Sequence, residues 1–396
     1  MPESLIVDDL TGTRPPLFAG PFHVDLDLTN ACNLRCSHCS VSSDKPLPGE
    51  LDTVGMLALL DQLHDLGVLT LTVAGGEPLL RPDAIEILEH ACSLPGWSVT
   101  VITNGTYFSE KMVQALLSRC PGLTVNVSID GSTPERFDFL RHRLRRTPKA
   151  QEALFKQVID GTRFAVESGL KVHANFALTR ATRFDLEDTY ELVMELGVRD
   201  LLAIKFFPGG RGLDHLRQME FPYREWAQVM VELTEKKAAG ELPRLALAVV
   251  AAWEFYLPLV DAGMDIEAAE KLWSYRAPLR ESFYRQNRTV GDPSGIADLN
   301  VVANGEVYPI TLMSGNPAAL CGNFRGSSLA TVWEKSRLLQ DLRGLELEDL
   351  PKECSDCRIS QLCGGGSRAR ALVHTDSLQG ADLTCPILGD SGGIFE

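Results

Sequence analysis

The chain has 396 residues and a formal net charge of −15, from 38 lysines and arginines against 53 aspartates and glutamates. Its length predicts two or three domains with ample core, and 44% hydrophobic and 23% charged residues are ordinary for a soluble globular protein. The net charge argues against nucleic acid and against an anionic membrane surface as partners, and no apolar run is long enough to cross a bilayer.

The first ten residues, MPESLIVDDL, lack the basic and apolar regions of a secretory signal. We therefore expect a cytoplasmic protein. In that compartment the ten cysteines are not expected to form disulfides. Cysteines that stand in groups indicate metal ligands there.

Residues 21–207 alternate short apolar runs with amphipathic ones, the pattern of repeated βα units. Strands separated by helices are as a rule parallel, with the helices outside. Six units predict an α/β fold with a partial (β/α)6 barrel, short of the eight units of a complete one. The expected strands lie at 22–28, 68–74, 98–103, 123–129, 171–178 and 201–207, with helices at 54–66, 83–92 and 186–196.

The alternation stops after residue 207. Residues 208–296 are predicted to be helical, most clearly at 225–238, and to connect the parts or shape a substrate site. A β-hairpin is expected at 299–310, turned at Asn304-Gly305, and a helix at 329–343. We thus expect a lead-in at 1–20, the partial barrel at 21–207, the connecting segment at 208–296, and a small cysteine-rich α+β domain at 297–396.

A first cysteine group, Cys32, Cys36 and Cys39 in ACNLRCSHCS, directly follows the first expected strand. Ligands of parallel sheets bind beyond the C-terminal ends of the strands, where this loop would lie. A [4Fe–4S] cluster normally takes four thiolates, so three would hold three irons and leave the fourth iron open. Zinc binding and a fortuitous cysteine cluster are the alternatives, although zinc sites usually pair C-x2-C with a second pair elsewhere.

The C-x3-C-x2-C spacing resembles the signature of the radical S-adenosylmethionine (SAM) enzymes, in which SAM caps the open iron. A second motif, Gly75-Gly76-Glu77-Pro78, follows the second strand and is similar to the family's GGEP motif, which binds the methionine amino group of SAM. Glycines at this point let the backbone approach a ligand closely. The resemblance also implies that His38 contacts the adenine; a lone exposed histidine is the alternative.

Polar residues at later strand ends complete the site that the resemblance implies. Asn104 and Ser128 are expected to contact the ribose or carboxylate of SAM, and Arg141 to pair with the carboxylate; Asp130 follows Ser128. Asn-Gly and Asp-Gly also suit ordinary turns, so that alternative stays open. The basic run at 141–149 indicates either an anion site or a solvated face.

A second cysteine group lies near the C-terminus: Cys354, Cys357, Cys363 and then Cys385. Four thiolates close the shell of a [4Fe–4S] cluster or of a structural Zn²⁺. The spacing resembles the SPASM extension of radical SAM enzymes, in which the corresponding cysteines ligate the outer auxiliary cluster.

This sequence departs from the SPASM pattern at two positions. Ser367 and Ile310 replace cysteines of the inner auxiliary cluster that some relatives carry. We therefore expect one auxiliary [4Fe–4S] cluster and no inner one. Cys321 is then expected to be a free thiol, and Cys92 and Cys120 to be core residues.

The resemblance implies an enzyme that takes an electron from a flavodoxin- or ferredoxin-type protein, cleaves SAM to a 5′-deoxyadenosyl radical and abstracts hydrogen from its substrate. The SPASM group favours oxidative or crosslinking maturation of a ribosomally made peptide. Alternatives are side-chain modification of a tetrapyrrole, as in haem biosynthesis, and dehydrogenation or epimerisation of an aminocyclitol or sugar. A non-catalytic iron–sulfur protein is expected to have lost the Gly-Gly-Glu-Pro motif or Arg141, and both are present.

Overall fold

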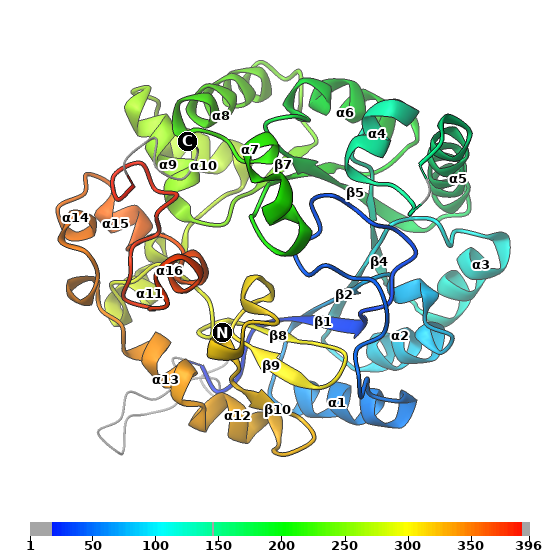
Figure 1. Cartoon of the computed structure of the whole chain (residues 1–396), viewed down its shortest axis with the longest axis horizontal. Coiled ribbons are helices and arrows are strands. Elements are labelled where there is room, and N and C mark those ends of the chain that lie inside the picture. The colour runs from blue at the N-terminus through cyan, green and yellow to red at the C-terminus, as the bar shows by residue number, and fades with distance from the viewer. Residues whose placement is uncertain (1–17, 145, 390–396) are drawn as a thin grey trace.

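The computed structural model describes residues 18–144 and 146–389, so most of the lead-in expected at 1–20 lies outside it. Within these residues one open sheet runs in the order β10-β9-β8-β1-β2-β3-β4-β5-β6-β7, and helices surround it (Figure 1). Strands β8 and β1 to β7 pair in parallel, while β9 and β10 are antiparallel. The strands are β1 His23–Thr29, β2 Thr70–Gly75, β3 Ser98–Thr103, β4 Thr124–Ser128, β5 Lys171–Leu178, β6 Leu201–Lys205, β7 Leu245–Ala248, β8 Asp298–Val301, β9 Glu306–Tyr308 and β10 Gly322–Asn323.

The helices fall between the strands and after the last of them. They are α1 Thr53–Asp65, α2 Ala84–Ser93, α3 Glu110–Arg119, α4 Pro134–Leu140, α5 Pro148–Glu167, α6 Leu186–Glu195, α7 Leu216–Met219, α8 Tyr223–Ala238, α9 Ala252–Asp261, α10 Ile266–Trp273, α11 Ser282–Asn287, α12 Leu329–Lys335, α13 Arg337–Gly344, α14 Lys352–Ser355, α15 Ser360–Cys363 and α16 Arg368–Thr375. None of the helices described is both long and apolar enough to cross a membrane.

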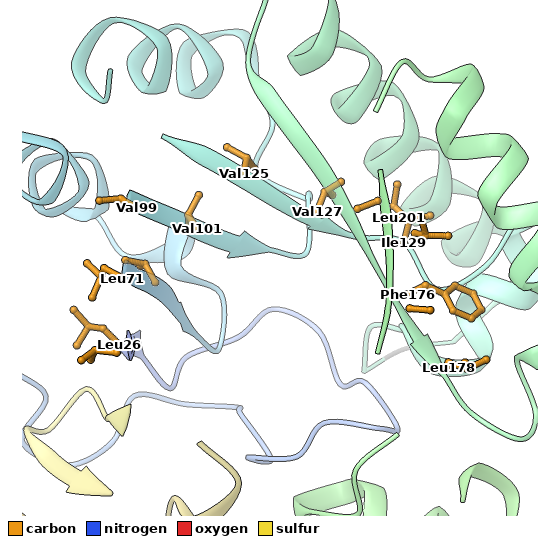
Figure 2. Close-up of a cluster of buried hydrophobic side chains, with 14 of the residues drawn as sticks. Leu26, Leu71, Val99, Val101, Val125, Val127, Ile129, Phe176, Leu178 and Leu201 are labelled. Atoms are coloured by element: carbon orange, nitrogen blue, oxygen red, sulfur yellow. The ribbon is translucent and has the colours of Figure 1, made fainter. Parts of the chain in front are cut away.

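The core forms where the apolar residues of the strands meet the buried stripes of the helices. Neighbouring strands contribute β-branched and leucine side chains such as Leu26, Val101 and Val127, which are fully buried (Figure 2). Helix α1 buries Met56, Leu59, Leu60 and Leu63, a spacing that repeats with the helical turn. Burying each such side chain stabilises the fold by about 1.5–3 kcal/mol.

The predicted α/β fold is confirmed, and each of the six strands expected in 21–207 is present. The hairpin turned at Asn304-Gly305 is also present, as β8 and β9. The expected single helix at 329–343 is divided at Ser336 into α12 and α13. That serine follows one helix and precedes the next, with an extended backbone.

Residues 208–296 are mainly helical, as expected, but they also contain a strand that the sequence analysis did not predict. Residues Leu245–Ala248 form β7, which pairs in parallel with β6 and extends the six strands expected from the sequence. A short apolar run cannot be assigned to strand or helix by its periodicity alone, and only pairing with β6 decides it. The sheet also continues into the C-terminal part, because β8 pairs with β1. The domain boundaries expected from the sequence stay predictions.

Candidate functional site

A cavity of about 250 Å³ lies at the C-terminal ends of strands β1 to β4. All three cysteines of the first group line it, together with residues from the ends of β2, β3 and β4 and from two later loops. Backbone hydrogen bonds hold the cysteine loop in place: Arg35 N–H donates to the carbonyl of His142 (2.7 Å), and Ser37 N–H donates to that of Leu140 (2.9 Å). The loop is therefore anchored to the C-terminal end of α4 and to the residues just after it.

Glycines at the end of β2 allow this segment to press against the cysteine loop. Gly75 has a φ of 116°, in the left-handed region. A Cβ on Gly75 would lie 2.4 Å from the carbonyl oxygen of Thr29, and one on Gly76 would lie 2.2 Å from that of Ala31. Only glycine fits at either position, and both residues line the cavity.

Glu77 and Pro78 lie behind the cavity, outside its lining. The Glu77 carboxylate is fully buried and accepts hydrogen bonds from Thr103 Oγ1 (2.8 Å) and from the backbone N–H of Asn104 (2.8 Å). Burial raises the pKa of Glu77 to about 7, although these hydrogen bonds oppose the rise. Glu77 thus ties the end of β3 to the glycine turn.

Asn104 and Ser128 both reach the cavity wall. The Asn104 side chain donates to Asn33 Oδ1 (2.9 Å) and accepts from Thr106 Oγ1 (2.6 Å), and its amide nitrogen lies 4.0 Å from the sulfur of Cys32. Asn104 therefore supports the cysteine loop directly. Ser128 ends β4 and is buried.

A buried ion pair orients Arg141 into the cavity. Its Nε donates to Asp130 Oδ2, and its Nη1 lies 3.8 Å from the sulfur of Cys36. Asp130 is 1% exposed and also accepts from the backbone N–H of Ala177 (2.6 Å). Asp130 is absent from the cavity lining, so it acts on the cavity through Arg141.

His38 lines the cavity as a neutral imidazole. Burial lowers its pKa to about 4, although the nearby carboxylate of Asp130 opposes this. Nε2 lies 3.5 Å from Asp130 Oδ2. Nδ1 is buried with no hydrogen-bond partner among the described residues, and an unpaired buried polar atom of this kind is expected to meet a ligand.

Arg211 lines the cavity, and the sequence analysis missed it. Its guanidinium donates to the carbonyls of Cys36 (3.1 Å) and Ser43 (3.1 Å), and its backbone N–H donates to that of Cys39 (3.0 Å). The signal was available, because Pro208-Gly-Gly-Arg-Gly follows the sixth strand as the other glycine-rich site segments follow theirs.

The four C-terminal cysteines, Cys354, Cys357, Cys363 and Cys385, line one second cavity. Trp253, Ile359, Ile387 and Leu388 give it apolar walls. Burial raises the pKa of the Cys354 thiol to about 11 and that of Cys363 to about 12. The sulfur of Cys363 accepts a hydrogen bond from the backbone N–H of Gly366 (3.2 Å). Among the described residues no three His, Cys, Asp or Glu side chains meet closely enough to hold a single metal ion.

The two positions that depart from the SPASM pattern have other structural roles. Ser367 caps α16 by accepting from the N–H of Arg370 (3.3 Å). Ile310 packs against the apolar cluster of Val302, Tyr308, Met313, Ala319, Ala369 and Leu372. Cys321 lies outside the cavity of the four cysteines, and Cys92 and Cys120 pack against the main core.

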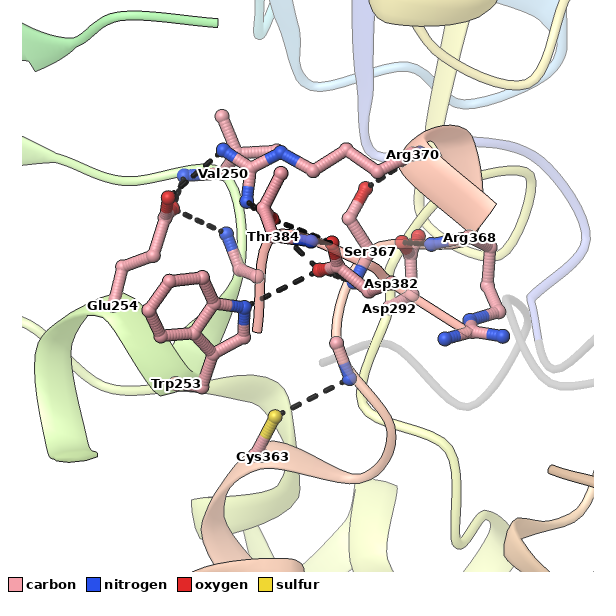
Figure 3. Close-up of polar contacts among 12 residues, drawn as sticks. Val250, Trp253, Glu254, Asp292, Cys363, Ser367, Arg368, Arg370, Asp382 and Thr384 are labelled. Carbon is pink, nitrogen blue, oxygen red and sulfur yellow. Dashed lines mark hydrogen bonds and ion pairs between the residues drawn. The ribbon is translucent and has the colours of Figure 1, made fainter. Parts of the chain in front are cut away.

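A buried ionic network joins the barrel to the second cysteine group (Figure 3). Glu254 on α9 accepts from Arg370 Nη2 (2.8 Å) and pairs with Lys205 at the end of β6 (2.9 Å). Asp382 accepts from Trp253 Nε1 (3.2 Å) and from the backbone N–H of Ser367 (3.0 Å). Since Trp253 lines the second cavity, the network links that cavity to the sheet.

Residues 26–193, which include the first cysteine group and the strands around its cavity, match the model of the Radical SAM superfamily. Residues 26–193 therefore form a radical SAM domain, and the chain is an enzyme. Its cofactors are accordingly a [4Fe–4S] cluster and SAM.

Known proteins resemble this chain along most of its length. The AdoMet-dependent heme synthase of Methanosarcina barkeri is 28% identical over 352 residues, 88% of this chain and 91% of that protein. The mycofactocin maturase MftC of Mycobacterium tuberculosis is 25% identical over 375 residues, 92% of this chain and 83% of that protein. The crystal structure of Streptococcus suis SuiB bound to S-adenosylmethionine superposes with a TM-score of 0.69 at 17% identity, covering 93% of this chain and 76% of that one, which shows a shared fold.

Proposed function

We propose that Cys32, Cys36 and Cys39 hold the [4Fe–4S] cluster and leave one iron for SAM. The supporting observation is that the three thiols line one cavity whose lining includes no fourth cysteine. A [4Fe–4S] cluster normally takes four thiolates, so the remaining position is available to a chelating ligand.

The other cavity residues fit the rest of SAM. Gly75 and Gly76 line the cavity with backbone alone, which suits the methionyl end of SAM. The guanidinium of Arg141 is aimed by Asp130 and suits a carboxylate. The imidazole ring of His38 can stack on the adenine, and its unpaired Nδ1 is available for a hydrogen bond.

When bound, the cluster and SAM supply a 5′-deoxyadenosyl radical, which abstracts hydrogen from the substrate. In this proposal Glu77, Ser128 and Arg141 bind and orient, and they do not act as acids or bases. Glu77, held by Thr103 and Asn104, keeps the glycine turn in register with the cysteine loop. The electron donor we propose is a flavodoxin- or ferredoxin-type protein in the cytoplasm.

We further propose one auxiliary [4Fe–4S] cluster on Cys354, Cys357, Cys363 and Cys385. Their shared cavity and the N–H···S hydrogen bond from Gly366 to Cys363 support it. The roles of Ser367 as a helix cap and of Ile310 as a core residue support the absence of an inner cluster. The parts at 21–207, 208–296 and 297–396 are proposed as barrel, connecting segment and auxiliary domain.

For the substrate we propose a ribosomally made peptide, matured by oxidation or crosslinking. Similarity to MftC along 92% of this chain supports a maturase, and SuiB, which shares the fold, has been crystallised with its precursor peptide SuiA. The second candidate is a tetrapyrrole. It is favoured by the similarity to the heme synthase, which covers 91% of that protein.

Anaerobically reconstituted protein tests the proposal. With dithionite and SAM it is expected to release 5′-deoxyadenosine and methionine, and intact SAM would overturn the assignment of the first cavity. A short peptide encoded beside the gene and a carboxylated tetrapyrrole are then added separately. Mass spectrometry distinguishes the candidates, because the substrate loses hydrogen or a side-chain fragment and the other compound stays unchanged.

A further inference from the structure

Arg368 is a buried cation without a carboxylate partner. It is 1% exposed, in the first turn of α16, and forms no ion pair within 4 Å among the described residues. Its Nε is buried there without a hydrogen-bond partner. Burying an unpaired charge costs several kcal/mol in a protein, so the position calls for a compensating negative charge.

The guanidinium instead donates to backbone carbonyls on two cysteine-bearing segments. Nη1 donates to the carbonyls of Leu378 (2.8 Å) and Gly380 (2.9 Å), in the loop before Cys385, and Nη2 donates to that of Gly365, which follows Cys363. Gly365 itself lines the cavity of the four cysteines. Arg368 therefore sits one peptide unit away from that cavity.

The carboxylates of Asp292 and Asp382, which contact the start of α16, are engaged elsewhere. Asp292 accepts from the backbone N–H groups of Arg368 (2.6 Å) and Ser294 (2.8 Å). Asp382 accepts from Trp253 and Ser367 and lies 3.8 Å from Arg370. Figure 3 shows the Arg368 guanidinium pointing away from this group of contacts.

Arg370, two residues along the same helix, provides the contrast. It is equally buried, but its Nη2 donates to Glu254 at 2.8 Å. Of these two buried arginines of α16, one is neutralised by protein carboxylates and the other is not. The unneutralised one is the one that adjoins the cysteine cavity.

We propose that Arg368 is the counter-charge of the auxiliary cluster and raises its reduction potential. This rests on the auxiliary cluster of the proposed function. Four thiolates around a [4Fe–4S] core carry a net negative charge, which grows by one on one-electron reduction, and cluster potentials depend on such charge and on burial. A fixed buried cation stabilises the reduced form more than the oxidised form. The cluster thereby becomes a better acceptor for the electron left on an oxidised substrate.

The test measures the midpoint potential of the auxiliary cluster, by electron paramagnetic resonance during anaerobic redox titration. To isolate its signal, Cys32, Cys36 and Cys39 are replaced by alanine in the full chain. In that background, Arg368→Gln removes the charge and Arg368→Lys keeps it. We expect a more negative potential for Arg368→Gln and a potential near that of the parent for Arg368→Lys.

Arg358→Gln is the matched control. Arg358 follows Cys357 and carries the same charge, but it is about half exposed and paired with Asp261, so solvent and its partner screen it. We expect a smaller shift than for Arg368→Gln.

The remaining outcomes are also decisive. Loss of the cluster in Arg368→Gln but not in Arg368→Lys supports the counter-charge, because both variants lose the guanidinium fork and only Arg368→Lys keeps the charge. An unchanged potential in Arg368→Gln overturns it. Loss of the cluster in both variants overturns it too, since Arg368 then acts through its forked hydrogen bonds. If the parent variant, which lacks Cys32, Cys36 and Cys39, binds no iron, the auxiliary cluster itself is refuted. The proposed function must then be revised.

Discussion

The two cysteine groups of this chain are built differently, although both line cavities. The first offers three thiols on one loop, and polar groups from several strand ends surround them: Arg141, the turn at Gly75-Gly76 and the unpaired Nδ1 of His38. The second offers four thiols from the C-terminal segments, with apolar walls from Trp253 and neighbouring aliphatic residues.

This difference separates a site that takes a ligand from a site that is closed. A cavity with unsatisfied polar groups and one thiol too few for a [4Fe–4S] cluster can bind an exchangeable ligand. A cavity with four thiols and mainly apolar walls has a low local dielectric, which raises the influence of nearby buried charges. Removing a thiol should therefore have different consequences at the two sites.

The largest effect is expected for Cys36→Ala. Loss of one of only three thiols should reduce release of 5′-deoxyadenosine from SAM to the background of dithionite alone, as measured by liquid chromatography. The control is Cys120→Ala, since Cys120 is as buried as Cys36 but lines neither cavity. Full activity of Cys36→Ala would refute the assignment of the first site.

At the second site, Cys357→Ala should have a partial effect. The wild-type protein is expected to bind about eight irons, from two four-iron clusters, and the variant about half as many. Release of 5′-deoxyadenosine should persist in part, because the first cavity is untouched. Iron analysis and the cleavage assay are run on the same preparation; normal iron content would contradict an auxiliary cluster on this group.

Glu254→Gln tests the network that joins the second site to the barrel. Replacing one partner of a buried ion pair is expected to lower the free energy of unfolding by about 3–5 kcal/mol, measured by urea denaturation of cluster-free protein. Glu187→Gln is the control: Glu187 pairs with Lys236 on the surface, and its loss should cost less than about 1 kcal/mol.

The effect of Glu254→Gln should depend on pH. Burial by itself raises the pKa of Glu254, but the charges of Arg370 and Lys205 outweigh it and lower the pKa from 4.5 to about 2. The folded chain therefore keeps this carboxylate ionised where the unfolded chain binds a proton. The stabilisation is complete above pH 4.5 and is lost as the pH falls toward 2. A difference between wild type and variant that stayed constant from pH 6 to about pH 3 would contradict this account.

Local sequence was sufficient for the strands and for the cysteines, because both depend on residues close together in the chain. Strands β1 to β6 follow from apolar periodicity. Strand β7 does not, since its four residues become a strand only by pairing with β6. The glycine-rich segment after β6 marks Arg211 as a candidate, but its hydrogen bonds to carbonyls of the cysteine loop join distant parts of the chain, and the sequence does not reveal them. The support of Arg141 by Asp130 likewise depends on a contact that spacing alone does not reveal.

The smallest expected effect concerns Ser367, which replaces a cysteine of the SPASM pattern. As the cap of α16, it is expected to contribute about 1 kcal/mol to stability, so Ser367→Ala should lower the unfolding free energy by that amount and leave the iron content unchanged. Ser328→Ala removes the equivalent cap of α12, outside the cavity of the four cysteines, and should match it. If Ser367→Ala lost iron while Ser328→Ala did not, the Ser367 hydroxyl would contribute to cluster binding at the second site, and its role would not be limited to capping α16.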